Sequence, residues 1–553
     1  MNKIYKTLLA AAVAVPALTL TGCIEETFPE GGTVTKDMIQ KVPGAADNYA
    51  LGMPSYLKAV FILPAEMHYD FGYPAMMFIR DTMTGDMPVA ASGYDQFTGW
   101  RENIYQGPEY LMSQFPWWYY YKLVQTANQT LAAIDKETED AHLKTLMGYA
   151  YGFRAMAYLD LARTYEFLPN DKTSEVNDNG NNVKNLTVPI VTEEVDEALA
   201  RSNPRAPHEQ MSEFILSDLD KAEALINSEA RSSKTMPDLA CIYGLKARLY
   251  MWDENYPKAA EYARMAISAS GCTPLSPDEW TSKTDGFNNI NSHAWMWGIN
   301  YVEEDDAVQT AIINPTSWFS NEYVEGYSAV GPYVMMSKSL YDMMRDDDCR
   351  KLCFVAPEGS PLAGKEIFID RSAMINALGD PIDLPPYSSL KFRPGQGNMK
   401  EYLVACTVGI PLMRVEEMYF IEAEAIAHNN PTEGAQLLTS FMNSYRCTEK
   451  SFTVLGTTTA DVVDEIFNQK RIEFFLEGQT FFDIKRLNKP VIRNYEGTNY
   501  YESSAFNTTT RPAWMNMCIV RQEENGNNAL IGWNNPDPSN AYVDTEGGDD
   551  EEE

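Results

Sequence analysis

Histidine and basic residues are scarce in this chain of 553 residues. There are 5 histidines, and 44 lysines and arginines stand against 78 aspartates and glutamates, which gives a formal net charge of -34. Because an acidic surface repels phosphate backbones, nucleic acid is excluded as a partner. Cys349 and Cys353 have the spacing C-x3-C, but no histidine lies near them in the sequence to complete a zinc site. We therefore predict no metal site there.

Long apolar runs are absent beyond the first thirty residues. The one such run, Leu8 to Leu20, follows Lys3 and Lys6 and is too short to cross a bilayer comfortably, which is typical of a secretory signal. It ends in "LTGC", which resembles a bacterial lipobox, although an ordinary signal with a chance cysteine is the alternative. We expect residues 1–22 to be a signal peptide, Cys23 to carry a lipid anchor, and the remainder to be a water-soluble body.

Cysteine is infrequent after Cys23. Seven remain, at positions 241, 272, 349, 353, 406, 447 and 518. An exported protein can oxidise cysteines, and an odd number leaves at least one of them unpaired. The sequence leaves open whether any of them pair.

Motifs of common enzymes are missing as well. The chain has no P-loop, no G-x-S-x-G, no H-E-x-x-H and no dinucleotide fingerprint. The acidic runs "VEEDDA" and "RDDDCR" lack the spacing of a known calcium loop and are interpreted as solvated faces. The end of the chain, residues 541–553, includes "EGGDDEEE", and we expect this acidic tail to be disordered because like charges repel.

Apolar residues at spacings of three and four predict amphipathic helices, mainly over 117–168, 208–268 and 411–487. In "PWWYYYKLVQTANQTL", Trp117 and Tyr121 share one helical face, which favours a place in the core. The segment 239–268 predicts two helices joined at "DENYP", with small alanines where they meet. It resembles a tetratricopeptide unit, with Ala259 and Ala263 packing its second helix. The fold class is therefore mostly α, a tetratricopeptide-like helical-repeat scaffold.

Long stretches without helical periodicity separate these helices, mainly 64–116, 269–410 and 488–540. They are rich in Gly, Pro, Asn, Asp and aromatic residues. Because compact domains seldom keep so much irregular chain without a use for it, we expect these insertions to form a second, ligand-binding half.

Several of these blocks together resemble the SusD/RagB family of nutrient-uptake outer-membrane lipoproteins. The blocks are the lipobox, the hairpin at 239–268, "YGFRAMAYLDLARTY", "RVEEMYFIEAEAIA" and "QKRIEFFLEGQTFFDIKRLN". The last is similar to a family pattern that reads E-R-R-x-E-L-x-x-E-G-x-R-x-x-D-L-x-R, with Gln469 where Glu is usual and Thr480 where Arg is usual. "CIEE" also resembles the acidic stretch that follows the lipidated cysteine in surface-exposed lipoproteins of Bacteroidota.

This resemblance implies a non-catalytic binding protein without a cofactor. Its helical body would dock on a SusC-type TonB-dependent transporter, and its irregular half would bind an oligosaccharide or polysaccharide outside the cell. The resemblance also implies a position at the extracellular face of the outer membrane, held there by the lipid.

The acids of "KRIEFFLEGQTFFDIKRL" allow an enzymatic alternative. Glu473 and Glu477 are four residues apart, so on a helix they lie about 6 Å apart, near the separation of about 5 to 5.5 Å that a retaining glycosidase requires. The same stretch carries four bases against three acids, so every carboxylate has a possible partner. Ion pairing lowers the pKa of a carboxyl group, whereas a general acid needs it raised. We therefore interpret Glu473, Glu477 and Asp483 as structural, with Gly478 at a helix end.

Two loop segments combine aromatic rings that can stack on a sugar with polar groups that can bind its hydroxyls. Each tryptophan has the alternative of being core. The candidate residues are Asp86, Tyr94, Trp100 and Arg101 in the first segment, and Trp295, Trp297, Trp318 and Tyr323 in the second.

Two other functions stay open at this point. The chain could be the peptide-uptake partner of such a transporter, or a surface scaffold that binds no sugar. Clustered tryptophans favour sugar over peptide, and nothing in the sequence names the sugar.

Overall fold

The computed structural model describes residues 40, 42, 44–63, 67–90, 94–226 and 231–542. The predicted signal peptide, Cys23 and all but the first two residues of the predicted acidic tail lie outside these residues.

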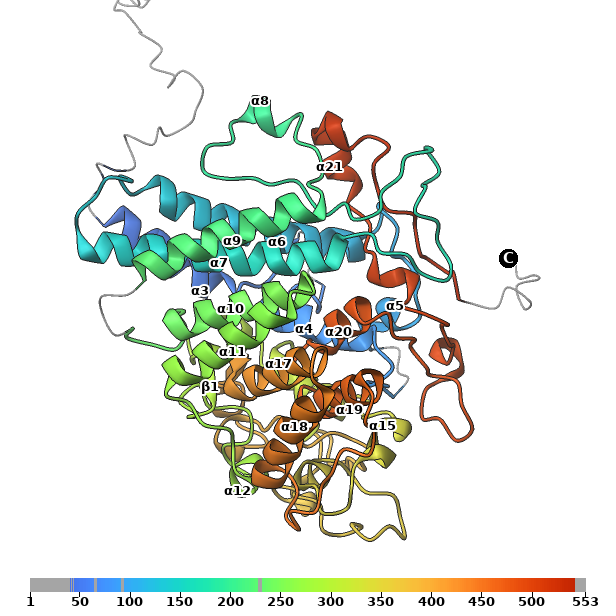
Figure 1. Ribbon diagram of the computed structural model, residues 1–553. Coiled ribbons are helices and arrows are strands. Elements are labelled where there is room, and N and C mark those ends of the chain that lie inside the picture. The colour runs from blue at the N-terminus through green and yellow to red at the C-terminus, as the bar shows by residue number, and fades with distance from the viewer. Residues whose placement is uncertain are drawn as a thin grey trace, which may run out of the picture.

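The described chain is mostly helical (Figure 1). The longer helices are α3 (Ala45–Tyr56), α4 (Gly72–Thr82), α6 (Leu111–Ala132), α7 (Ala141–Tyr165), α9 (His208–Leu225), α10 (Leu239–Trp252), α11 (Tyr256–Ser270), α17 (Val415–Ala427), α18 (Pro431–Tyr445) and α19 (Thr459–Glu473). The short helices are α5 (Thr98–Arg101), α8 (Glu197–Ala200), α12 (Pro277–Trp280), α13 (Asp306–Gln309), α14 (Pro315–Phe319), α15 (Lys338–Met343), α16 (Tyr402–Ala405), α20 (Thr480–Arg486) and α21 (Arg521–Gly526). The two strands are β1 (Trp295–Asn300) and β2 (Gly409–Arg414).

Consecutive long helices pack against each other, as in a helical-repeat array. In Figure 1, α6, α7 and α9 lie together, α10 and α11 form the next layer, and α17, α18 and α19 follow. The predicted hairpin is confirmed in α10 and α11, where Ala259, Ala263 and Ala266 are all fully buried. Small side chains at these positions let the two helices approach closely.

Side-chain caps set where the scaffold helices begin. Asp140 accepts hydrogen bonds from the backbone N–H groups of His142 and Leu143 at 2.9 and 3.1 Å, which starts α7. Asp238 accepts from Cys241 N–H at 3.0 Å and starts α10 in the same way. Each cap satisfies N–H groups that have no partner within the helix.

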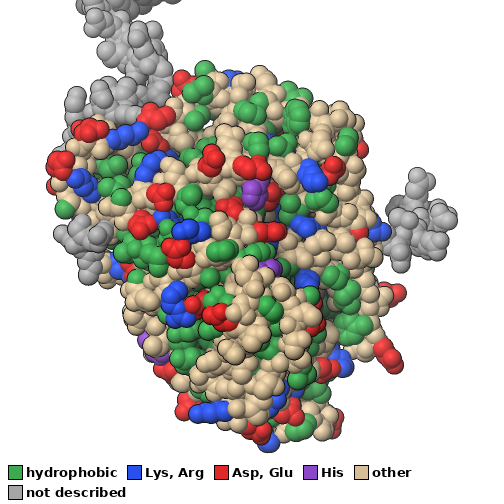
Figure 2. All heavy atoms as spheres, in the orientation of Figure 1, with side chains coloured by type: hydrophobic (Ala, Val, Ile, Leu, Met, Phe, Trp, Pro, Cys, Tyr) green, Lys and Arg blue, Asp and Glu red, His purple; other side chains and the backbone are tan. Residues whose placement is uncertain are grey.

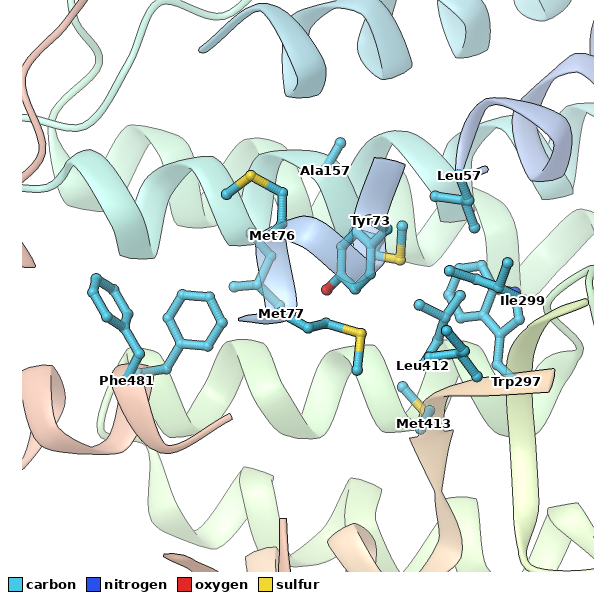
Figure 3. Close-up of a cluster of buried hydrophobic side chains, with 14 of the residues drawn as sticks. Leu57, Tyr73, Met76, Met77, Ala157, Trp297, Ile299, Leu412, Met413 and Phe481 are labelled. Carbon is cyan, nitrogen blue, oxygen red and sulfur yellow. The ribbon is translucent and has the colours of Figure 1, made fainter. Parts of the chain in front are cut away.

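One segment that we predicted to be irregular contains a long helix. All eleven residues of α4, within 64–116, are buried, and Figure 3 shows Tyr73, Met76 and Met77 of this helix inside the core. Its polar residues Arg80 and Asp81 are buried with the apolar ones, so the helix has no solvated face. The prediction of irregular chain was wrong for Gly72–Thr82.

The strands join the irregular segment 269–410 to the scaffold. β1 and β2 pair antiparallel, with Trp295 opposite Arg414 and Ile299 opposite Ile410, and α17 starts directly after β2. One buried cluster of apolar side chains includes residues from Ala46 to Tyr542 and so joins both halves, while smaller clusters lie around α17–α19 and within 324–399.

Candidate functional site

The four candidate tryptophans lie in the core. Their exposed fractions are 2% for Trp100, 1% for Trp295, 0% for Trp297 and 1% for Trp318. Figure 3 shows Trp297 in the same buried cluster as Ile299 and Leu412, and its indole N–H donates to the Thr235 carbonyl at 3.1 Å. The structure contradicts the prediction that these indoles form an exposed platform for a sugar, because their segments fold back onto the helices and use the rings as core.

The polar candidates are also engaged internally. Asp86 is buried and accepts a bidentate contact from Arg471, at 2.5 Å from Nη2 and 3.0 Å from Nε. Arg101 is buried and pairs with Asp95 at 2.5 Å. Tyr323 is buried and donates its hydroxyl to the Ala311 carbonyl at 2.7 Å. These contacts correct the expectation that the three side chains form a polar rim for sugar hydroxyls.

Tyr94 is the one candidate that reaches the surface. Its ring lies 5.4 Å from the ring of His68 and 5.5 Å from that of Tyr327, and the rings of His68 and Tyr327 are 5.9 Å apart. His68 and Tyr94 are half-buried, and Tyr327 is buried between them and the core. We call His68, Tyr94 and Tyr327 the aromatic patch.

Two of the core tryptophans, Trp318 and Trp100, pack behind this patch. Trp318 packs against Tyr327 at 6.5 Å and against Phe97 at 5.4 Å, and Phe97 in turn lies 6.3 Å from Trp100. The structure therefore brings the predicted segments 64–116 and 269–410 together, with Trp318 beneath the patch and Trp100 behind Phe97.

The aromatic patch is electrically neutral. His68 Nδ1 and the Tyr327 hydroxyl are 2.8 Å apart and share a hydrogen bond. Burial lowers the pKa of His68 and raises the pKa of Tyr327 far above its usual value, so both groups are uncharged at neutral pH. Uncharged rings with hydrogen-bonding edges suit the C–H face and hydroxyls of a sugar better than they suit an ion.

Sequence reasoning missed His68 and Tyr327. They are 259 positions apart, and neither stands beside a tryptophan in a loop rich in polar residues. The aromatic richness of the two segments was the available signal, and it did not indicate which rings would face outward.

The acids of "KRIEFFLEGQTFFDIKRL" lie in a buried ion-pair network. Glu473 is fully buried and pairs with Arg446 at 2.7 Å, Arg350 at 3.1 Å and Arg414 at 3.3 Å. These arginines hold the pKa of the Glu473 carboxyl well below its usual value, against the raising effect of burial.

The neighbouring acids are paired too. Glu477 pairs with Lys391 at 2.6 Å and Arg414 at 2.8 Å. Asp483 pairs with Lys470 at 2.5 Å and Arg486 at 3.0 Å. The geometry supports the structural interpretation of all three acids.

Three further findings concern the described residues alone. Within them, no group of three or more His, Cys, Asp or Glu side chains is placed to hold a metal ion, and the seven described cysteines are unpaired. No helix in this part of the chain is long and apolar enough to span a bilayer.

Comparison with known proteins identifies relatives of this chain. One model of the SusD family, described as starch-binding and associating with the outer membrane, matches residues 77–251, and a second, described as the SusD family, matches residues 396–544. SusD-like protein P38 of Formosa agariphila is 22% identical over 422 residues, which cover 69% of this chain and 74% of that protein.

Solved structures share the fold. A SusD-like carbohydrate-binding protein of Bacteroides vulgatus aligns with a TM-score of 0.68 at 21% identity, over 88% of this chain and 96% of its own. A SusD superfamily protein of Bacteroides thetaiotaomicron aligns with a TM-score of 0.66 at 17% identity, over 91% and 100%. These structures confirm the predicted fold, a mostly helical, tetratricopeptide-like scaffold.

The two family matches lie on either side of the irregular segment that supplies Tyr327, and the aligned structures cover both halves. The chain belongs to the SusD/RagB family, which consists of non-catalytic binding proteins associated with carbohydrate at the outer membrane.

Proposed function

We propose that this protein captures a glycan outside the cell and passes it to a SusC-type TonB-dependent transporter. The observation that carries the proposal is the aromatic patch, where two irregular segments meet and present rings at the surface. Family membership supports the same function, because the relatives are associated with starch and other carbohydrate at the outer membrane.

Stacking would supply most of the affinity at such a site. Water competes for every sugar hydroxyl, so each hydrogen bond adds little net free energy. One ring that removes about 100 Å² of apolar surface from water contributes roughly 2 to 3 kcal/mol, at about 25 cal/mol per Å². A loss of that size is sufficient to abolish binding in the micromolar to millimolar range.

The test is calorimetric titration of Tyr94→Ala and His68→Ala with starch, fructan, xylan, mannan and host-glycan oligosaccharides. We expect the wild type to bind one glycan class and each variant to lose binding by about tenfold to a hundredfold. Tyr327→Phe keeps the ring but removes the hydroxyl that meets His68, so we expect a smaller loss. The exposed Tyr501, outside the patch, supplies the control Tyr501→Ala, which should bind as the wild type does.

Two outcomes would contradict this assignment. Unchanged glycan binding by folded Tyr94→Ala and His68→Ala would place the site elsewhere on the protein. Absence of binding to the whole panel, together with binding of oligopeptides, would favour the peptide-uptake alternative.

The transporter and the anchor complete the proposal. A tagged protein purified from native membranes in mild detergent should bring with it a TonB-dependent barrel, and recovery as a lone monomer would argue against that partner.

A lipid anchor on Cys23 follows from "LTGC". Labelling with a lipid precursor should mark the wild type and leave Cys23→Ala unmarked; equal labelling would rule the anchor out.

A further inference from the structure

A cavity of about 330 Å³ lies between the ends of several scaffold helices, away from the residues of the aromatic patch. It is lined by the last turns of α7 and α10, the start of α9, and parts of α17, α19 and α20. Figure 2 shows acidic, basic and histidine side chains close together on the face that carries α10, α17 and α20 in Figure 1. We call it the charged cavity.

Most of the charges that line this cavity are already paired within the protein. Glu166 uses one carboxylate oxygen for His208 Nδ1 and the other for the Trp252 indole N–H, both at 2.8 Å. Arg248 forms two bonds of 2.6 Å to Glu417. The buried acids of the cavity therefore have no unused oxygen to offer a ligand.

Two cations of the cavity, Lys485 and Arg511, have no carboxylate partner within ion-pair distance among the described residues. Lys485 is 3% exposed, and its ammonium donates to the Thr164 carbonyl at 3.0 Å, with no described carboxylate within ion-pair distance. Arg511 is half-buried and donates from Nε to the Asn488 side chain at 2.9 Å, also without a described carboxylate partner. Glu166 acts on both cations electrostatically but forms an ion pair with neither of them. Because burying a cation without a directly paired anion is energetically unfavourable, Lys485 and the half-buried Arg511 both have capacity for a negatively charged ligand.

Two amides beside these cations add neutral hydrogen-bonding groups. Gln479 and Asn185 line the same cavity, and within the described residues neither side-chain amide has a protein partner. Donors from an ammonium, a guanidinium and two amides thus line one cavity, where Lys485 is buried, Arg511 and Gln479 are half-buried and Asn185 is exposed. This is the composition of a site for a small polar anion.

We propose that the charged cavity binds one small carboxylate ligand through Lys485 and Arg511. A guanidinium matches the two oxygens of a carboxylate in geometry as well as in charge. The carboxylate could belong to a sugar acid or to the end of a short peptide, and the chemistry of recognition is the same for both.

Size and charge narrow the ligand further. Pockets for small molecules occupy about 300 to 1,000 Å³, so this cavity is large enough for one sugar ring and too small for an oligosaccharide. Glu209 and Glu254 line the cavity and are exposed, and they repel anions. A second negative charge on the ligand is therefore unfavourable, and a monocarboxylate should bind better than sulfate or phosphate.

The effect of burial on the pKa values of the two cations also favours a negatively charged ligand. Burial lowers the pKa of Lys485 well below its usual value and also lowers the pKa of Arg511. A bound carboxylate offsets that effect by favouring the protonated amine.

The experiment is calorimetry on the full chain in detergent with sodium glucuronate, using glucose as the neutral ligand with the same ring. We expect glucuronate to bind and glucose not to bind. Arg511→Gln should weaken glucuronate binding by about tenfold or more, because it removes a charge-assisted contact. Arg521→Gln, which removes an exposed arginine outside the cavity, should leave it unchanged.

Other measurements keep the proposal testable if a variant folds poorly. Lys485→Met removes the amine that meets Thr164 at the end of α7, so circular dichroism must first show that it folds; Gln479→Ala provides a milder change with a smaller expected loss. N-acetylalanine tests the peptide source, and its binding in place of glucuronate would support the carboxylate chemistry from that source.

Three results would overturn the proposal. They are equal binding of glucuronate and glucose, wild-type binding by folded Arg511→Gln, and no binding of either carboxylate at about 50 mM. Tyr94→Ala should bind glucuronate normally, so failure at the charged cavity and failure at the aromatic patch can be told apart.

Discussion

Glu473 forms ion pairs with three arginines that come from three different parts of the chain. Its partners Arg350, Arg414 and Arg446 come from the irregular segment, from β2 and from the residue after α18. All of these side chains are buried. Removing one charge from such a network leaves the others enclosed without compensation.

We therefore expect Glu473→Gln to reduce the free energy of unfolding by about 3 to 5 kcal/mol, measured by chemical denaturation. Glu197→Gln, which removes an exposed carboxylate paired with Arg201, should change it by less than about 1 kcal/mol. Because the folded pKa of Glu473 lies below the unfolded one, this stabilisation is present above the unfolded pKa and is lost as the pH falls. Similar losses in the two variants would contradict the network.

Asp81 gives the opposite dependence on pH. Burial raises its pKa from 3.8 to about 8, against the lowering effect of the hydrogen bond from the Gly478 N–H at 2.9 Å. Between these two values the folded state binds more protons than the unfolded state, so stability falls as the pH rises. We expect Asp81→Asn to equal the wild type near pH 4 and to exceed it near pH 8, by an amount on the order of a few kcal/mol.

Thermal or chemical unfolding across this pH range measures the Asp81 effect. Asp383→Asn changes an exposed carboxylate and should show no such trend. A difference between Asp81→Asn and wild type that stays constant with pH would refute the assignment.

At the scale of elements, the contact between α17 and α18 depends on a glycine. A Cβ on Gly434 would lie 2.5 Å from the Ala427 Cβ and 2.8 Å from the Ala423 carbonyl oxygen, closer than real contacts allow. Gly434→Ala should therefore push the two helices apart and lower stability by about 1 to 3 kcal/mol. Gly526→Ala in α21 meets no neighbouring atom within 4 Å and should be neutral or slightly stabilising. Equal melting temperatures for the two variants would contradict this packing argument.

The end of α19 was predicted at Gly478 but lies at Glu473. Leu476 and Gly478 have positive φ, and a Cβ on Gly478 would lie 2.8 Å from the Met77 Cα in α4. The chain therefore leaves the helix early to pass α4, and Glu477 turns toward Lys391 and Arg414. The local pattern could not indicate this, because the obstacle comes from residues about 400 positions earlier.

At the scale of the whole molecule, the scaffold and the irregular segments share one core. The main apolar cluster contains side chains from α4, α7, α10, β1 and α14, and the Glu473 network links the same halves through buried ion pairs. We expect calorimetry to show one main unfolding transition rather than separate transitions for two domains. Two well-resolved transitions of comparable enthalpy would show that the halves are independent.

The sequence determined what depends on neighbours along the chain. Periodicity of three and four predicted the scaffold helices, the alanines predicted the α10–α11 hairpin, and the balance of acids and bases predicted ion pairing for Glu473, Glu477 and Asp483. The sequence blocks shared with the SusD/RagB family predicted the overall fold. The helical patterns and each family block lie within a few tens of residues, so they can be seen before the chain folds.

Only the tertiary structure decided which side chains pair with each other and which aromatic rings reach the surface. Glu473 pairs with no base of its own stretch, since Arg471 turns to Asp86 and Lys470 turns to Glu424 and Asp483. The candidate tryptophans became core, while His68, Tyr94 and Tyr327 became the aromatic patch. A large ring is equally apolar in a core and on a sugar-binding surface, and which it occupies depends on what the distant chain packs against it.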